Sequence, residues 1–200
     1  MTFSKPLYIE AFNSDRTHPH LWKKILLFLV LIIIEAALAT FTVDYTQELT
    51  KQGLTDAQAQ QASPIVMVLG IIGVIIGSII FVGITFLITM IIYKIFKKTL
   101  SKKGMFGGVL RYYNTVLCAT IIISAIQVLF HLDMATVKID SLNIFAPGNT
   151  LLGAFSLTNL LSGWLFGVML HSNGHLPAKW SWLLGIAVFI LSVVLAVVTA

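Results

Sequence analysis

Charged side chains are scarce in this chain of 200 residues. Only 10% of the residues are Asp, Glu, Lys or Arg, whereas 58% are hydrophobic. A soluble globular domain carries about 25% charged residues, so the composition excludes a soluble surface and predicts a polytopic helical membrane protein. The formal net charge of +5 does not indicate a nucleic-acid partner. The Lys and Arg residues lie in short segments beside apolar runs, where they set orientation and attract anionic lipids.

Cysteine and the usual catalytic groupings are also lacking. Cys118 is the one cysteine, so an intrachain disulfide is excluded. The sequence has no paired intramembrane acids, no Ser/His/Asp arrangement and no cysteine cluster. His171 and His175 are four residues apart, but Ser172 stands where the zinc metalloprotease motif has a Glu. We therefore expect no metal site, no cofactor and no enzymatic activity.

Five apolar runs are long enough to cross a hydrocarbon core of about 30 Å. They cover residues 25–43, 65–93, 112–132, 151–170 and 180–200. We predict an all-α fold, a bundle of five transmembrane helices within residues 25–200, preceded by a head of residues 1–24. Pro6 and Pro19 prevent one continuous helix in that head. The second run is longer than the ~20 residues that a crossing needs, so its helix must tilt, kink or project.

The polar segment before the second run carries several helix signals. Gly53 is suited to ending a short helix. Thr55 and Gln58 fit a capping box, and Ser63 with Pro64 would serve as N-cap and first residue of the second span.

The distribution of cations predicts the orientation in the membrane. With the head inside, eleven of the thirteen Lys and Arg residues fall on one side, and only Lys51 and Lys138 on the other. This positive-inside bias predicts a cytoplasmic head and an outer C-terminus.

Glu35 is the most unusual single residue, because it lies about 15 Å into the first span by helical rise. An acid inside the membrane indicates a functional site by default. Neutral candidates for its partner are Asn159 and Ser162 in the fourth span and Ser78 in the second. Gln127 is a further polar candidate in the third span. Two interpretations remain open: a protonatable or ion-binding site in a transport path, or a neutral Glu that is hydrogen-bonded between helices.

Small residues mark candidate helix contacts. Gly73 and Gly77 form a GxxxG pattern in the second span, and Gly163 and Gly167 lie in the fourth. Such residues let helix backbones approach closely in lipid. For the second span we favour packing inside the bundle over a dimer interface.

The segment between the second and third spans is strongly basic. Lys94, Lys97 and Lys98 would share one helix face, and the glycines of GMFGG would let the following loop turn tightly against the membrane. The cations either bind anionic lipid head groups or simply set the topology. The head-group candidates are Lys94, Lys97, Lys98, Lys102, Lys103 and Arg111.

Three segments together resemble a known family. They are QGLTDAQAQQA before the Gly-rich second run, KKTLSKKGMFGGVL leading into RYYNTVLCATIIISAIQVLF, and NLLSGWLFGVMLHSNGHLPAKWSWLLGI. Over residues 25–200 this order is similar to the YIP-one domain (Ypt/Rab-interacting-protein-like) family, particularly its short bacterial members. The resemblance implies five spans in a bacterial cell membrane. Eukaryotic relatives are linked to vesicle traffic and Rab GTPases through longer heads, so the short head here does not predict a GTPase partner.

We therefore expect a non-enzymatic multi-pass membrane protein with a role in membrane organisation or of a trafficking-like kind. Its expected partners are membrane lipids with anionic head groups, and a second copy or another membrane protein. The alternative is a small transporter or flippase-like permease that uses Glu35 and Asn159.

Overall fold

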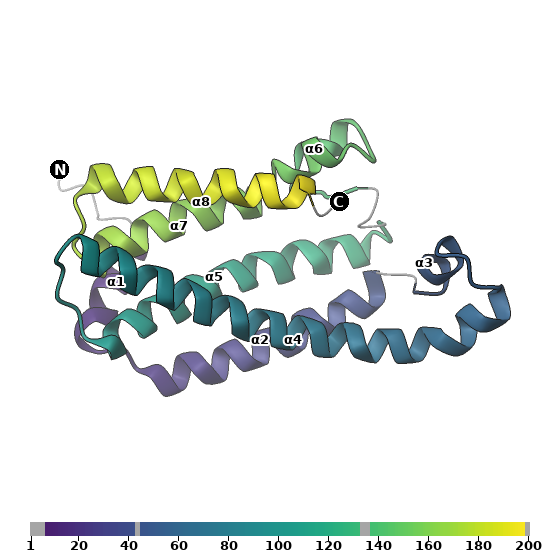
Figure 1. Cartoon of the computed structure of the whole chain (residues 1–200), viewed down its shortest axis with the longest axis horizontal. Coiled ribbons are helices and arrows are strands. Elements are labelled where there is room, and N and C mark those ends of the chain that lie inside the picture. The colour runs from purple at the N-terminus through teal and green to yellow at the C-terminus, as the bar shows by residue number, and fades with distance from the viewer. Residues whose placement is uncertain (1–6, 43–44, 133–136, 199–200) are drawn as a thin grey trace.

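The computed structural model describes residues 7–42, 45–132 and 137–198, and these form long helices side by side (Figure 1). No named strand occurs in these ranges, so the predicted all-α class is confirmed. The elements are α1 (Leu7–Thr17), α2 (Leu21–Thr42), α3 (Tyr45–Lys51), α4 (Asp56–Ile95), α5 (Lys102–Leu129), the 3-10 helix η1 (Leu142–Phe145), α6 (Thr150–Ala154), α7 (Leu157–Ser172) and α8 (Ala178–Val198).

The start of α4 confirms one local signal and contradicts another. Gly53 adopts a left-handed φ of +96° after α3. Thr55 and Gln58 then form the predicted capping box, in which Gln58 N donates to Thr55 Oγ1 and Thr55 N donates to Gln58 Oε1. Helix α4 therefore begins at Asp56, and Pro64 lies inside it. The prediction that Ser63 caps the second span is wrong, because the earlier cap already starts the helix.

Helix α4 projects beyond the rest of the bundle. Its 40 residues correspond to about 60 Å at 1.5 Å per residue, twice the hydrocarbon thickness. The projecting N-terminal part carries α3 (Figure 1). Here Gly70 leaves room for Tyr45, whose Oη would lie 3.1 Å from a Cβ atom at that glycine. The second apolar run therefore lies in a helix that extends beyond the other helices.

Four helices are long and apolar enough to cross a membrane, namely Leu21–Phe41, Asp56–Ile95, Lys102–Leu129 and Ala178–Val198. The protein is therefore an integral, multi-pass membrane protein. The predicted fourth span, residues 151–170, is not one continuous helix, and a count of five spans is not confirmed. Helix α7 has 16 residues, or about 24 Å, which is short of the ~20 residues that a crossing needs.

Backbone pairing explains the break between α6 and α7. Leu142 N donates to Phe155 O, and Leu157 N donates to Asp140 O at 2.6 Å. Ser156 then caps α7 through its Oγ, which accepts from Asn159 N. These bonds hold the chain extended between the two helices, so the apolar run is divided even though its composition favours a single span.

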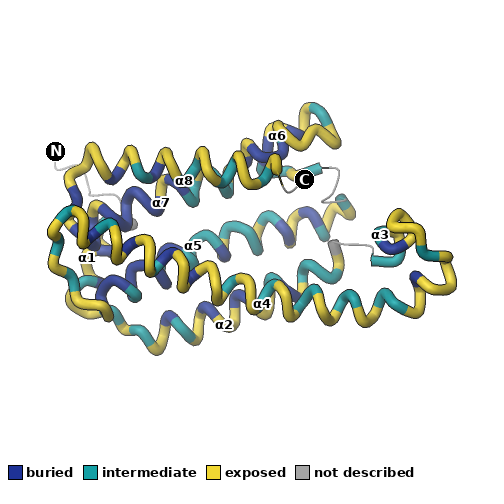
Figure 2. The backbone as a smooth tube through the Cα atoms, in the orientation of Figure 1, coloured by how far each residue is buried: buried dark blue, intermediate teal, exposed yellow. Residues whose placement is uncertain are grey.

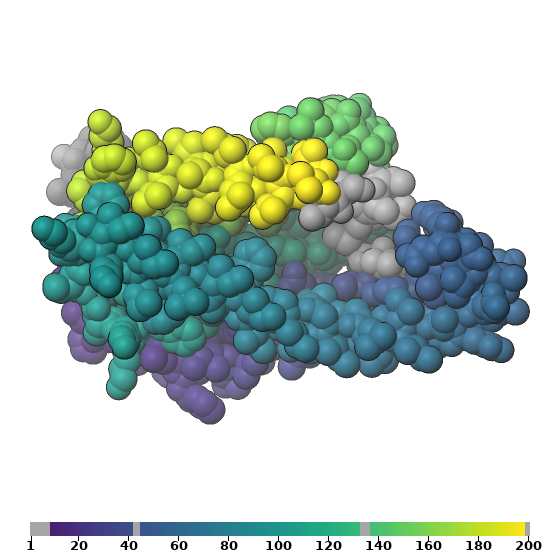
Figure 3. Space-filling model, in the orientation of Figure 1, coloured from purple at the N-terminus to yellow at the C-terminus, as the bar shows by residue number. Residues whose placement is uncertain are grey.

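Burial is concentrated where α1, α2, α5 and α7 meet, while the outer faces of α2, α4 and α8 are exposed (Figure 2). Helix α7 is the most enclosed, with Leu165–Leu170 all buried. The space-filling view shows that α8 and α4 form much of one face of the molecule (Figure 3). Large apolar side chains are exposed on these helices, among them Ile80, Ile91 and Ile186. Such surfaces suit contact with hydrocarbon.

Candidate functional site

A charged cluster joins α1, α2 and α5 at the end of the bundle that carries most of the lysines. Asp15 of α1 is only 1% exposed. Arg111 of α5 donates to both of its carboxylate oxygens, from Nε to Oδ2 at 2.5 Å and from Nη2 to Oδ1 at 2.9 Å. Lys24 of α2 forms a second ion pair with Asp15 Oδ1. A single buried carboxylate therefore connects three helices.

Helical spacing brings these side chains together. On α1, Phe12 and Asp15 are three residues apart and both are buried, so they lie on the face that packs against α5 and α7. On α2, Lys24 and Phe28 are buried four residues apart. Lys24 is further held by its Nζ, which donates to the backbone carbonyl of Gly107 at 3.1 Å.

A cavity of about 390 Å³ lies beside this cluster, between α2 and α5. The ionisable side chains that line it are cations, a histidine and the thiol of Cys118, and among the described residues no acid faces into it. Such a cavity concentrates anions, because all of its full charges have one sign. Its lining residues are His20, Lys23, Lys24, Leu27, Arg111, Asn114, Thr115 and Cys118.

The GMFGG glycines are part of the packing of this region. Helix α5 begins at Lys102, so these residues are helical, and Gly104, Gly107 and Gly108 are buried. A Cβ atom on Gly107 would lie 2.7 Å from Cβ of Pro19, and one on Gly108 would lie 1.9 Å from Nδ2 of Asn173. The predicted tight turn against the membrane is wrong. The glycines instead let the α1–α2 connection and the α7–α8 turn lie directly against α5.

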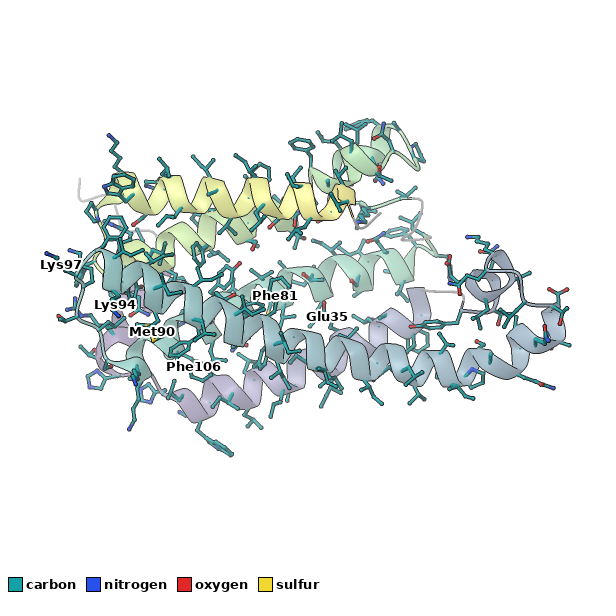
Figure 4. The ribbon with its side chains drawn as sticks, in the orientation of Figure 1. Glu35, Phe81, Met90, Lys94, Lys97 and Phe106 are labelled. Atoms are coloured by element: carbon teal, nitrogen blue, oxygen red, sulfur yellow. The ribbon has the colours of Figure 1, made fainter. Side chains whose placement is uncertain are left out.

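The basic segment also differs from its predicted form. Helix α4 ends at Ile95 and Lys97 has a left-handed φ of 52°, so Lys94, Lys97 and Lys98 do not share one helix face. Figure 4 shows Lys94 and Lys97 at the same end of the molecule. Arg111 does not belong with the exposed lysines of this segment, because its side chain is bonded to Asp15, 96 residues away in the sequence.

Lys102 and Lys103 remain exposed at the start of α5. Together with Lys94, Lys97 and Lys98 they form the group called here the basic surface.

Glu35 is half-buried in α2, near the middle of the bundle (Figure 4). Its carboxylate has no hydrogen bond or ion pair within the described part of the chain. The described residues therefore provide no hydrogen-bond partner for a neutral Glu35. Within the same residues, no group of three or more His, Cys, Asp or Glu side chains comes together.

The other polar candidates are bonded elsewhere. Asn159 lies in the first turn of α7, where its Nδ2 donates to Ala154 O at 2.8 Å. Ser162 Oγ and Tyr112 Oη are 2.5 Å apart. Gln127 Nε2 donates at 2.7 Å to a backbone carbonyl in the loop after α5. The structure thus places each of these three side chains in a separate contact, and none of them bonds Glu35.

The candidate glycines fall into two groups. In α7, a Cβ atom on Gly163 would lie 2.7 Å from Gly185 O, and one on Gly167 would lie 3.0 Å from Ser181 O, so these positions lie directly against α8. In α4, a Cβ atom on Gly73 or Gly77 would meet open space. The favoured packing of Gly73 and Gly77 inside the bundle does not occur among the residues that the structure describes.

A family model described as the Yip1 domain matches residues 3–200. This chain belongs to the Yip1 family. The resemblance drawn from the sequence is thereby confirmed, and the match includes the head as well as the apolar runs. No curated protein and no solved structure matches the chain.

The Yip1 chain also has site residues that the sequence pattern did not single out. They are Asp15, Lys24 and the cavity residue His20. A weak signal existed for Asp15, since it stands three residues after Phe12 in a short helical segment and would share its face. Nothing in the sequence indicated that this face is buried or that Arg111 lies opposite.

Proposed function

We propose that this Yip1 protein is a non-enzymatic membrane protein that organises its surroundings through contacts with lipids and with other membrane helices. The observation that carries the proposal is the concentration of cations at one end of the bundle. Helix α5 carries Lys102 and Lys103 of the basic surface and also Arg111 of the Asp15 cluster. Cations near an anionic membrane surface contribute about 1 kcal/mol each to lipid attraction.

The proposed topology has five membrane segments within residues 25–200, with α6 and α7 as the interrupted fourth segment. The cation-rich end faces the cytoplasm, and the C-terminal end of α8 faces outside, in a bacterial cell membrane. The distribution of eleven Lys and Arg residues against two supports this orientation. Residues 1–24 remain the cytoplasmic head, and α1 docks this head on α5 and α7.

Thiol labelling tests the orientation. Cys118 is replaced by Ser, and one new cysteine is introduced by Lys103→Cys or by Lys51→Cys. In intact cells, a membrane-impermeant maleimide should label the variant at position 51 and spare the one at position 103. The reverse pattern would contradict the topology.

Lipid analysis tests the function. We compare the protein carrying Gln at all five positions of the basic surface with a control carrying Lys51→Gln and Lys138→Gln at the opposite end. After extraction in mild detergent, mass spectrometry gives the ratio of phosphatidylglycerol to phosphatidylethanolamine that remains bound. The proposal expects a lower ratio for the first variant alone. An unchanged ratio would remove the basis of the proposed function.

The permease remains a second candidate, because the half-buried carboxylate of Glu35 has no partner among the described residues. An unpaired acid inside a spanning helix is typical of proton or ion paths. Its test is a flux measurement on the Glu35→Gln variant, described in the Discussion.

A further inference from the structure

We propose that the cavity between α2 and α5 binds the head group of one anionic phospholipid, with the lipid's acyl chains lying past Leu27 and Cys118. The inference rests on the proposed function at the basic end of the bundle, and it names a ligand and a defined site. It differs from attraction to the basic surface because it requires one lipid in one place.

The charged side chains that line the cavity favour an anion. Lys24 and Arg111 are both paired with the buried carboxylate of Asp15. Their side chains are 11% and 29% exposed. Buried charge is unfavourable unless it is compensated. Both cations also line the cavity, and none of the described residues that line it is an acid.

Further groups at the cavity reinforce the preference for a phosphate. Lys23 is exposed and has no ion pair in the described ranges, and His20 lies four residues before Lys24, just ahead of α2. Charge-assisted bonds from Lys and Arg to phosphate oxygens are among the stronger hydrogen bonds in proteins.

Asn114, which lines the cavity, also offers a hydrogen-bond acceptor. Asn114 Nδ2 donates to Lys24 O at 3.1 Å, while its buried Oδ1 has no donor among the described residues. A hydroxyl on the head group, as in phosphatidylglycerol, would supply this donor.

The other wall of the cavity is suited to a lipid tail. Helices α2 and α5 run in the same direction (Figure 1). Each carries an apolar cavity residue further along the helix than its cation. On α2, Leu27 follows Lys24 by about one turn, and on α5, Cys118 follows Arg111 by about two turns. A ligand that fits both ends has a charged head and an apolar chain. The cavity of about 390 Å³ is also far larger than a free phosphate ion requires.

Native mass spectrometry of the delipidated full-length protein tests the site. The probes are phosphatidylglycerol, phosphatidylcholine with the same acyl chains, and inorganic phosphate. We expect one tightly bound phosphatidylglycerol, and at least tenfold weaker binding of the other two probes. Equal binding of phosphatidylcholine would overturn the anion requirement. Equal binding of phosphate would show that the site takes any small anion.

Two lysines at the same end provide a matched comparison. Lys23 lines the cavity and Lys103 does not, although both are exposed. Lys23→Gln should weaken phosphatidylglycerol binding about fivefold, as expected for one cation near a lipid phosphate. Lys103→Gln should leave it unchanged. Equal weakening by both would refute a defined site while leaving the proposed function, attraction to the whole basic end, intact.

Cys118 gives a second measurement on the wild-type chain. It is the one cysteine, it is exposed and it lines the cavity. Phosphatidylglycerol should slow its reaction with N-ethylmaleimide in detergent, and inorganic phosphate should not. An unchanged rate in the presence of bound phosphatidylglycerol would place the lipid elsewhere and overturn the proposal.

Discussion

Removing the charge of Asp15 should destabilise the whole bundle, because this carboxylate is shared by three helices. Asp15→Asn keeps the size and shape of the side chain and removes its negative charge. Lys24 and Arg111 would then lose the carboxylate that they share, in a region where Asp15 itself is only 1% exposed. The charge, and not the packing, is the property that changes.

The expected cost follows from the burial of the partners. Breaking a buried ion pair by removing one member costs about 3–5 kcal/mol. The Arg111 side chain is 29% exposed and keeps part of its hydration, so we expect ~3 kcal/mol, the lower end of that range. Lys24 is more deeply buried, at 11%. Adding Lys24→Met to Asp15→Asn should therefore recover more stability than adding Arg111→Met.

The assay is reversible unfolding in mixed micelles, followed by circular dichroism as the fraction of dodecyl sulfate is raised. Glu48→Gln is the matched control, because it removes an exposed ion pair with Lys51 whose side chains are 47% and 60% exposed. Such a surface pair is worth about 0–1 kcal/mol. If Asp15→Asn costs no more than Glu48→Gln, the cluster does not hold the helices together and our reasoning fails.

Three further predictions concern the apolar helices. Gly163→Ala should lower the free energy of unfolding by about 1–3 kcal/mol in the same assay, because the new Cβ atom would lie 2.7 Å from Gly185 O. Gly73→Ala should be neutral or stabilising, because its Cβ atom would meet open space. Equal effects of the two substitutions would contradict the packing of α7 on α8. Gly73→Leu together with Gly77→Leu should abolish crosslinked dimers in mild detergent if that open face joins two copies, and unchanged crosslinking would discard the face. Glu35→Gln should abolish proton flux into proteoliposomes loaded with a pH-sensitive dye if the permease interpretation holds, and flux equal to wild type would reject it.

Local signals predicted some features of the fold well. The capping box at Thr55 and the left-handed Gly53 depend on residues within one or two turns of each other, and both appear as expected. The same stretch also contained a competing signal at Ser63 and Pro64. A helix with two possible N-caps begins at the earlier one when the residues between the two caps can be helical. The residues between Thr55 and Ser63 are helical here, so the helix begins after Thr55.

The candidate site was predicted less well, for a physical reason. Glycines in GMFGG are compatible with a turn or with close helix packing, and the choice depends on Pro19 and Asn173, which lie far away in the sequence. Arg111 has the appearance of one more surface cation until Asp15 is placed beside it. Likewise, Glu35 has the depth of a functional acid, but its surroundings depend on how α2 packs against α4 and α5.

Composition and hydropathy alone determined that this is a helical, multi-pass membrane protein, because the apolar character of each segment can be read from that segment by itself. The Yip1 family was indicated by the resemblance of three segments and shown by the family match. Tertiary structure decided that the fourth run is divided, that α4 projects, and that a shared carboxylate unites three helices. Those features arise from hydrogen bonds, ion pairs and close contacts between segments such as Asp140 with Leu157 and Asp15 with Arg111. Such contacts stabilise the fold only after the chain has brought residues that are distant in the sequence together.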